Sequence, residues 1–154
     1  MTQRLNYYAA DQKLIAPLLE IEELIKAGPL DERLNHLVKM RASQINGCAY
    51  CLHMHSADAR KAGESEARLY LLDAWHESNL YTPRERAALA WTESLTRVAK
   101  THAPDADYEL VKSQFTDQEL VHLTLLITNI NAWNRLSVGF RAVHPNDRVK
   151  QAAA

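Results

Sequence analysis

Hydrophobic residues along the chain recur at intervals of three and four positions. This spacing is typical of helices that bury one face, and no stretch keeps the period of two that a half-buried strand requires. The sequence therefore predicts an all-α fold, a single-domain bundle of six or seven helices over residues 1–154. Residues 1–10 are expected to form an extended N-terminal arm and residues 146–154 a tail.

Glycine, proline and capping residues mark the ends of the predicted helices. The first helix is expected to begin near Ala16, because Pro17 is tolerated only in a first turn, and to stop at Gly28-Pro29. Two capping boxes, each a threonine followed three residues later by a glutamate, open later helices at Thr82 and Thr116. The predicted helices cover residues 16–27, 32–46, 47–62, 65–75, 83–100, 108–113 and 117–144.

The helix predicted after Thr116 is apolar nearly all the way round. Its hydrophobic residues are Leu120, Val121, Leu123, Leu125, Leu126, Ile127, Ile130, Trp133 and Leu136. A helix of this kind lies in the centre of a bundle or in a subunit interface.

Composition and charge exclude several classes of protein. A chain of 154 residues with 47% hydrophobic residues is long and apolar enough to bury a core. The net charge of −1, with both signs interspersed, predicts neither nucleic-acid binding nor a membrane-surface patch. The N-terminus lacks the apolar core of a signal peptide, and the longest uncharged run, 120–134, is too short for a typical membrane span. We therefore expect a cytoplasmic protein.

One stretch, residues 46–55, contains both cysteines of the chain. An Asn46-Gly47 turn leads into a predicted helix on which Cys48, Cys51 and His55 fall within a sector of about 60°. In a cytoplasmic protein, a Cys-x-x-Cys pair is more often catalytic or metal-binding than a permanent crosslink. Two thiols and an imidazole on one helical face indicate a redox site.

This arrangement suits peroxide or disulfide chemistry. The first turn of a helix stabilises the thiolate form of Cys48 and Cys51, and His55, one turn later, can take a thiol proton. A thiolate attacked by peroxide becomes a sulfenic acid, and the second thiol then closes a disulfide. An external dithiol has to reopen that disulfide. Exchange with another protein needs the same residues without the peroxide step.

Two other interpretations of the stretch remain open. Cysteine is among the most buried residue types, so the pair is in one interpretation an inert part of the core. In the other, Cys48, Cys51 and His55 are metal ligands, with His36 or His53 as the fourth.

Other aromatic and histidine residues have ordinary structural interpretations. Trp75, Trp91 and Trp133 are expected to anchor the core or an interface rather than to line a pocket. Tyr50 is expected to project away from the cysteine face, and His122 to be a buried histidine with a hydrogen-bond partner.

The cysteine stretch and its flanks resemble a known family. The motif Ala42-Ser43-Gln44-Ile45-Asn46-Gly47-Cys48-Ala49-Tyr50-Cys51-Leu52-His53-Met54-His55 is similar to the signature of the alkylhydroperoxidase D-like branch of the carboxymuconolactone decarboxylase family. The resemblance extends to residues 58–64, 82–90 and 131–136, and it covers the chain from about Leu34 to Arg141.

The resemblance implies a function and roles for the site residues. It implies an all-α homo-oligomer, a trimer or hexamer, with peroxidase or disulfide-reductase activity and without haem, flavin or metal. Cys51 is then the cysteine that meets a small hydroperoxide, and Cys48 resolves the sulfenic acid and exchanges with a dithiol or thioredoxin-like reductant. His55 belongs to a proton relay with a glutamate twelve residues before the first cysteine.

At that position this chain has a histidine, His36, in place of the family glutamate. A second imidazole orients and charges His55 less effectively than a carboxylate, and it titrates near neutral pH. Glu32, one turn earlier on the same face, is a candidate substitute for the glutamate. His36 also completes the two-cysteine, two-histidine set of the metal interpretation.

The leading hypothesis is a thiol-dependent antioxidant peroxidase whose site residues are Cys51, Cys48, His55 and His36. The alternative is a redox or stress-interaction oligomer that cycles the Cys48–Cys51 disulfide without reducing peroxide. A metal-binding or purely structural oligomer is the third hypothesis.

Overall fold

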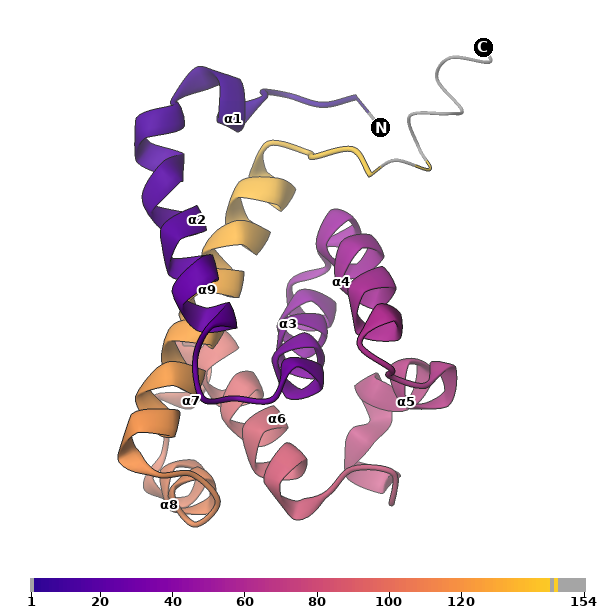
Figure 1. Cartoon of the computed structure of the whole chain (residues 1–154), viewed down its shortest axis with the longest axis vertical. Coiled ribbons are helices and arrows are strands. Elements are labelled where there is room, and N and C mark those ends of the chain that lie inside the picture. The colour runs from indigo at the N-terminus through magenta and orange to yellow at the C-terminus, as the bar shows by residue number, and fades with distance from the viewer. Residues whose placement is uncertain (1, 145, 147–154) are drawn as a thin grey trace.

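The chain is helical throughout the part that the structure, a computed structural model, describes, namely residues 2–144 and 146 (Figure 1). These residues contain no strand, which confirms the predicted all-α fold. They form nine α-helices and one 3₁₀-helix, more than the six or seven predicted. The elements are α1 (Tyr7–Ala10), α2 (Gln12–Lys26), α3 (Glu32–Asn46), α4 (Ala49–Lys61), α5 (Glu66–Leu71), η1 (Leu72–Glu77), α6 (Pro83–Thr96), α7 (Val98–Thr101), α8 (Asp105–Lys112) and α9 (Asp117–Gly139).

The additional helices come from local breaks and local caps. Residues 1–10 are not extended throughout, because the side chain of Asn6 accepts the Ala9 N–H and starts the single turn α1. The helix predicted over 83–100 divides at Arg97, whose backbone leaves the helical region, into α6 and α7. The helix predicted over 65–75 continues as η1, in which Ala74 is a kink. Of the predicted tail, all but residue 146 lies outside the described residues.

Helix α2 begins four residues before the predicted start at Ala16. Asp11 is its N-cap, and its carboxylate accepts the Leu14 N–H at 3.1 Å. Pro17 therefore lies inside the helix, where its missing N–H costs one hydrogen bond close to the N-terminal end. The N-cap outweighs the proline as a determinant of where the helix starts.

Both predicted capping boxes are present and open the two long C-terminal helices. Thr82 and Thr116 each accept an N–H from the glutamate three residues later, and each glutamate accepts the N–H of its threonine. Helix α9 buries one face, with Leu123, Leu126 and Ile127 at most 1% exposed. Full burial of side chains of this size stabilises a fold by about 1.5–3 kcal/mol each.

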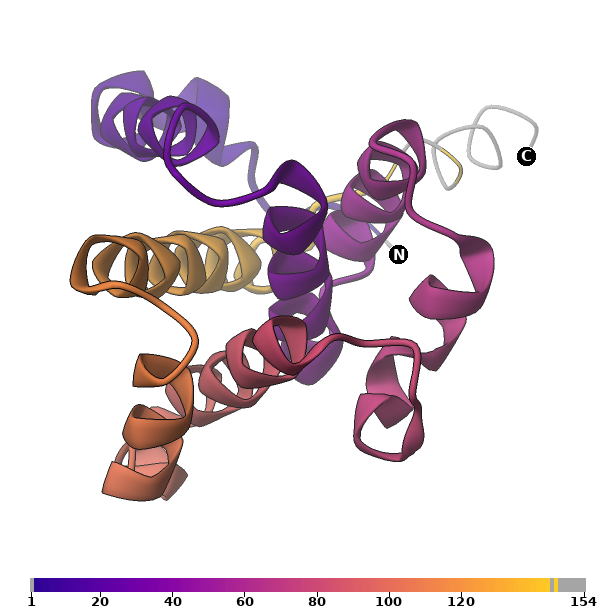
Figure 2. The same ribbon diagram turned by 60° about the horizontal axis from the view of Figure 1, so that its bottom comes forward.

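Helix α3 is the central element of the fold. It packs against α4, α6 and α9, and Figure 2 shows it standing between them. One hydrophobic core joins α2, α3, α6, α8 and α9, and a second joins α3 to α4, α5, η1 and α6. Trp91 lies in the first core and Trp75 in the second.

Helix α2 lies along α9, and α4 lies on the other side of α3 (Figure 1). Residues from α2, α3, α4 and α9 therefore face a common space, together with the short α1. None of the helices in residues 2–144 and 146 combines the length and the apolar character that crossing a membrane requires.

Candidate functional site

The cysteines lie at the turn between α3 and α4. Gly47 ends α3 in the left-handed conformation, with φ of 64°, which glycine adopts without the steric cost of a side chain. Cys48 is the N-cap of α4, and its Sγ accepts the Cys51 N–H at 3.3 Å. The two cysteines form a disulfide with a Cα–Cα distance of 5.3 Å. The predicted helix start at residue 47 is thus two residues early, because Cys48 serves as the cap.

A network of buried amides holds this turn against α9. Asn46 donates to the side-chain oxygens of Asn131 and Asn134, at 3.0 and 2.9 Å. Asn134 in turn donates to Ser43 Oγ at 3.0 Å, and Asn131 donates to Thr96 Oγ1. Since buried amides are stable only when paired, this network fixes the end of α3 and the position of the cysteines relative to α9.

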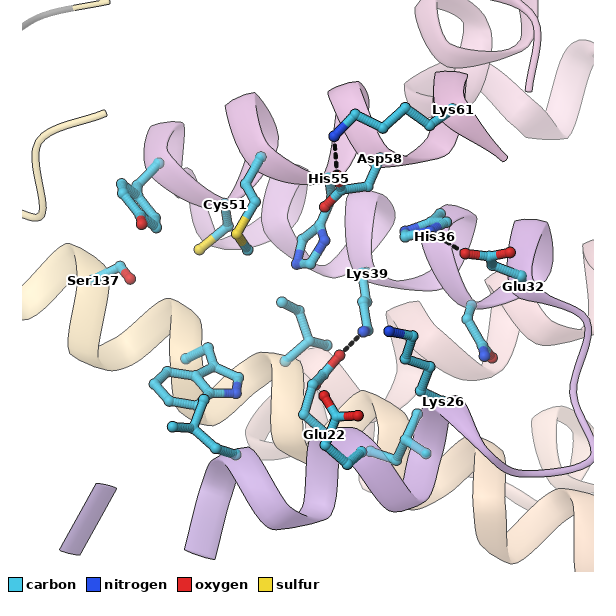
Figure 3. Close-up of a pocket in the computed structure, with 18 of the residues that line it drawn as sticks. Glu22, Lys26, Glu32, His36, Lys39, Cys51, His55, Asp58, Lys61 and Ser137 are labelled. Atoms are coloured by element: carbon cyan, nitrogen blue, oxygen red, sulfur yellow. Dashed lines mark hydrogen bonds and ion pairs between the residues drawn. The ribbon is translucent and has the colours of Figure 1, made fainter. Parts of the chain in front are cut away.

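Cys51 lines a pocket of about 450 Å³ (Figure 3). Cys48 is not among the lining residues, although both cysteines are at most 2% exposed. The aromatic and apolar lining residues are Tyr7, Tyr8, Leu19, Ile25, Tyr50, Met54, Ile130 and Trp133. The polar and charged ones, besides His36 and His55, are Glu22, Glu23, Lys26, Glu32, Asn35, Lys39, Asp58, Lys61 and Ser137.

His55 lies on the same side of α4 as Cys51, and both side chains point into the pocket (Figure 3). The imidazole is 6% exposed, and its Nδ1 has no hydrogen-bond partner among the described residues. Burial lowers the pKa of His55 to about 3, with further lowering from Lys39 and His36 and an opposing effect of Asp58. At neutral pH the imidazole is uncharged, so it can accept a proton but has none beyond its own N–H to donate.

His36 faces His55 from α3, with 6.2 Å between the ring centroids. Its Nε2 is 3.8 Å from the Glu32 carboxylate, one turn earlier. The candidate substitute for the family glutamate is therefore present, but it lies beside His36 rather than beside His55 (Figure 3). Three of the predicted site residues line one pocket, namely Cys51, His55 and His36. The fourth, Cys48, does not line the pocket but forms the disulfide with Cys51.

Six charged residues of this pocket were not predicted from the sequence, among them Lys39, Asp58 and Glu22. Lys39, on α3, is 7% exposed and forms an ion pair with Glu22 of α2. Asp58, on α4, accepts a hydrogen bond from Lys61 at 3.2 Å. Lys39 and Asp58 are each three residues after a site histidine, so helical spacing places them near the same face. No local signal indicated Glu22, which comes from a helix distant in the sequence.

The part of the chain that the structure describes contains no ligand cluster of the kind that the metal interpretation requires. No group of three or more histidine, cysteine, aspartate and glutamate residues there is arranged to hold a metal ion. Both cysteine sulfurs are bonded to each other rather than available as thiolate ligands.

The remaining sequence interpretations have mixed outcomes. Trp75 and Trp91 are buried in the two cores, as predicted, whereas Trp133 lines the pocket and stacks on Tyr8. Tyr50 also lines the pocket, so the expectation that it projects away from the site is wrong. His122 forms a hydrogen bond with the Ile25 carbonyl oxygen at 2.9 Å, which confirms the expected partner, but its side chain is half-buried rather than buried.

Comparison with known proteins identifies the family. Residues 16–94 match the model of the carboxymuconolactone decarboxylase family. The chain belongs to this family. It is 39% identical over 138 residues to YdfG, an uncharacterised protein of Bacillus subtilis, and the match covers 90% of this chain and 94% of YdfG.

A solved structure supports assignment of the chain to the AhpD-like branch of the family. A protein of unknown function from Agrobacterium tumefaciens, described as a candidate antioxidant defence protein AhpD, is 42% identical with a TM-score of 0.91. That match covers 94% of this chain and 99% of the other. The debrominase Bmp8 is 17% identical with a TM-score of 0.76, over 88% of this chain and 73% of Bmp8. At that identity the similarity shows the fold alone.

Proposed function

We propose that this protein is a thiol-dependent peroxidase that reduces small hydroperoxides at Cys51. One observation carries the proposal: Cys51 lines the pocket beside His55, while its resolving partner Cys48 is already bonded to it from behind. The likeness to an AhpD-type antioxidant defence candidate supports the same reaction class. The structure then corresponds to the oxidised, resting end of the catalytic cycle.

The proposed reaction begins when an external dithiol reduces the Cys48–Cys51 disulfide. The Cys51 thiolate attacks one peroxide oxygen, the O–O bond breaks, and an alcohol leaves after it gains a proton. The resulting Cys51 sulfenic acid reacts with Cys48, which releases water and restores the disulfide. One hydroperoxide and two thiols thus give one disulfide, one alcohol and one water.

Local structure favours the Cys51 thiolate. Cys51 lies in the first turn of the 13-residue helix α4, where free N–H groups and the helix dipole stabilise negative charge. His55 is uncharged and takes the thiol proton, and His36 supports it from α3. His36 thus occupies, in this proposal, the place of the family glutamate.

The reductant and the assembly remain part of the proposal. A dithiol or a thioredoxin-like protein supplies the electrons, without a metal or an organic cofactor. Apolar side chains on the outer face of α9, where Val121 is 61% and Leu125 50% exposed, support a homo-oligomer, and the trimer or hexamer is what the family resemblance implies. Such side chains on one face are typical of subunit interfaces.

Turnover with tert-butyl hydroperoxide and dithiothreitol tests the proposal. We expect peroxide consumption well above that of dithiothreitol alone. Cys51→Ser should abolish it, and Cys48→Ser should allow a single oxidation that leaves a trappable sulfenic acid on Cys51. A double Cys→Ser variant that still consumes peroxide would contradict the proposal.

The turnover assay, together with a redox titration against glutathione, distinguishes the peroxidase proposal from the alternative hypothesis. A protein that only cycles its disulfide with a partner would show a measurable Cys48–Cys51 redox equilibrium with glutathione. It would consume peroxide no faster than a free thiol does. That result would favour disulfide exchange as the function.

A further inference from the structure

An ion pair between the buried Lys39 of α3 and the partly buried Glu22 of α2, braced by a residue of α9, lines the pocket that contains Cys51. The Lys39 ammonium of α3 contacts one carboxylate oxygen of Glu22 from α2. The other oxygen of Glu22 accepts a hydrogen bond from Asn129 Nδ2 of α9 at 2.8 Å. Lys39 and Asn129 are 7% and 3% exposed. Glu22 is thus held in place on both of its oxygens, and it in turn holds Lys39.

This ion pair needs an explanation beyond stability. Moving a lysine ammonium out of water is costly, and replacing a buried ion pair by apolar side chains often leaves a fold as stable or more stable. Lys39 faces the same space as Cys51 and His55 instead of lying within a core (Figure 3). A charged group kept in a reaction pocket at such a cost indicates a role in the chemistry.

The proposed reaction requires a proton donor at the departing oxygen, in addition to the base that takes the thiol proton. When the O–O bond of an alkyl hydroperoxide breaks, the departing alkoxide is a strong base and has to be protonated. Burial keeps His55 uncharged, since its pKa is lowered to about 3. The family glutamate that would support it is absent, and His36 stands at its position.

We infer that the Lys39 ammonium is the catalytic acid that protonates the departing alkoxide, and that Glu22 and Asn129 position it. This inference rests on the proposed peroxidase function. The Cys51 thiolate attacks the peroxide oxygen that carries hydrogen, the S–O bond forms, and the O–O bond breaks. The alkoxide takes a proton from Lys39, which leaves a sulfenic acid, an alcohol and a neutral amine. The sulfur is oxidised by two electrons, the peroxide is reduced by two, and the amine regains the proton that the Cys51 thiol released to His55.

The charges around Lys39 suit this role. Glu22 faces it from α2, Asp58 and His55 from α4, and His36 lies on its own helix, while α9 contributes the uncharged Asn129. Burial lowers the pKa of Lys39 to about 8, and Asp58 acts in the opposite direction. The ammonium therefore predominates at neutral pH but gives up its proton more readily than an exposed lysine does, as an effective general acid should.

A comparison of two oxidants on Lys39→Met tests the inference. Tert-butyl hydroperoxide releases an alkoxide, whose conjugate acid has a pKa of about 16, as water does. Peracetic acid releases acetate, whose conjugate acid has a pKa of about 4–5 and which leaves without help. Rates of Cys51 oxidation in the reduced protein should fall about 100-fold with tert-butyl hydroperoxide and stay within about threefold with peracetic acid.

Two further variants complete the experiment. Lys100→Met, the same change on α7 outside the pocket, should leave both rates unchanged. Glu22→Gln keeps the shape of the side chain but releases the ammonium, so it should slow only the alkyl hydroperoxide, by about tenfold. It also serves as the test if Lys39→Met does not fold.

The outcomes are distinguishable. Equal losses with both oxidants, or no loss with tert-butyl hydroperoxide, would overturn the role of Lys39 while leaving the peroxidase proposal intact. A wild-type protein whose Cys51 reacts with neither oxidant would remove the peroxidase proposal, and the role of Lys39 with it. The expected result is a slower oxidation of Cys51 by tert-butyl hydroperoxide alone, with the rate for peracetic acid nearly unchanged.

Discussion

The imidazoles of His36 and His55 face each other across the helix pair α3 and α4, with 6.2 Å between their centroids. In the family pattern a carboxylate would stand in the place of His36. The two arrangements have opposite effects on His55, because a nearby carboxylate raises the pKa of an imidazole whereas a second imidazole lowers it. Burial is the main cause of the lowered pKa of His55, Lys39 and His36 lower it further, and this chain therefore has an unusually weak base next to its cysteines.

Restoring the carboxylate should strengthen that base. In the His36→Glu variant we expect the pKa of His55 to rise by about 1–3 units, since an opposite charge is placed within reach of the ring. Cys51 should then be oxidised about tenfold faster by hydroperoxide at pH 7. An NMR titration of His55 in the oxidised protein measures the first effect, and stopped-flow oxidation of the reduced protein the second. His36→Gln is the uncharged control, and an equal rise in that variant would argue against the electrostatic explanation.

The stability of the oxidised protein should fall on mild acidification. His55 has a pKa of about 3 in the folded chain and about 6.5 when unfolded, so the unfolded state binds the extra proton between these values. Stability is therefore complete above pH 6.5 and is lost as the pH falls toward 3. Between pH 6.5 and 5 the free energy of unfolding should decrease by about 2 kcal/mol.

Urea unfolding at the two pH values measures this decrease. The window lies above the range in which Glu85 and Glu93 contribute, because their pKa values are lowered and their stabilisation is lost only at more acidic pH. His55→Gln should show a much smaller decrease. An unchanged decrease in that variant would assign the acid sensitivity to another group.

The asparagine network at the cysteine turn should control both stability and thiol accessibility. Asn134, 1% exposed, accepts from Asn46 and donates to Ser43. Asn134→Leu leaves these partners with unmade hydrogen bonds, so the free energy of unfolding should fall by about 1–3 kcal/mol. The reduced cysteines should also be alkylated faster, because the end of α3 is less firmly held. Thr128→Leu, at an exposed position of α9, is the control, and equal effects in both variants would contradict a role for the network.

The aromatic end of the pocket should select for apolar hydroperoxides. Tyr8 stacks on Trp133 with 5.9 Å between ring centroids, and both line the pocket. Tyr8→Ala removes one of the aromatic rings that the cumyl group of cumene hydroperoxide would contact, a loss of about 1 kcal/mol of binding. The KM for cumene hydroperoxide should therefore rise several-fold. The rate with hydrogen peroxide, which is too small to use this contact, should not change. Tyr70→Ala, an exposed tyrosine that does not line this pocket, is the control. A parallel change with both peroxides would show that Tyr8 acts on the cysteines instead of on the substrate.

Local sequence was sufficient to predict the parts of the fold that depend on neighbouring residues. The capping boxes at Thr82 and Thr116 and the cysteine turn at Gly47 rest on contacts within four residues, and the structure has them where they were expected. Short-range reasoning failed at Arg97 and Ala74, where the backbone leaves the helical conformation although the sequence patterns of the helices continue. The predicted number of helices was too low because of these two breaks and because the local cap at Asn6, which starts α1, was not recognised.

The residues of the pocket likewise divide into those that local sequence predicts and those that it does not. Cys48, Cys51 and His55 share one helix, so their proximity follows from helical spacing. Glu22 reaches Lys39 only because α2 lies along α9, and no periodicity within α2 specifies which helix it packs against. Trp133 and Tyr50 were assigned away from the pocket because the shape of a cavity depends on how all surrounding helices cross.

The cysteine turn has a consequence for how redox changes affect this protein. Residues three apart in an α-helix have Cα atoms about 5 Å apart whether or not they are bonded. Cys48 and Cys51, as N-cap and third residue of α4, are held 5.3 Å apart in the oxidised form. We therefore expect the disulfide to open and close without a rearrangement of the backbone. A reductant or partner that distinguishes the two forms is then expected to recognise the sulfur atoms themselves.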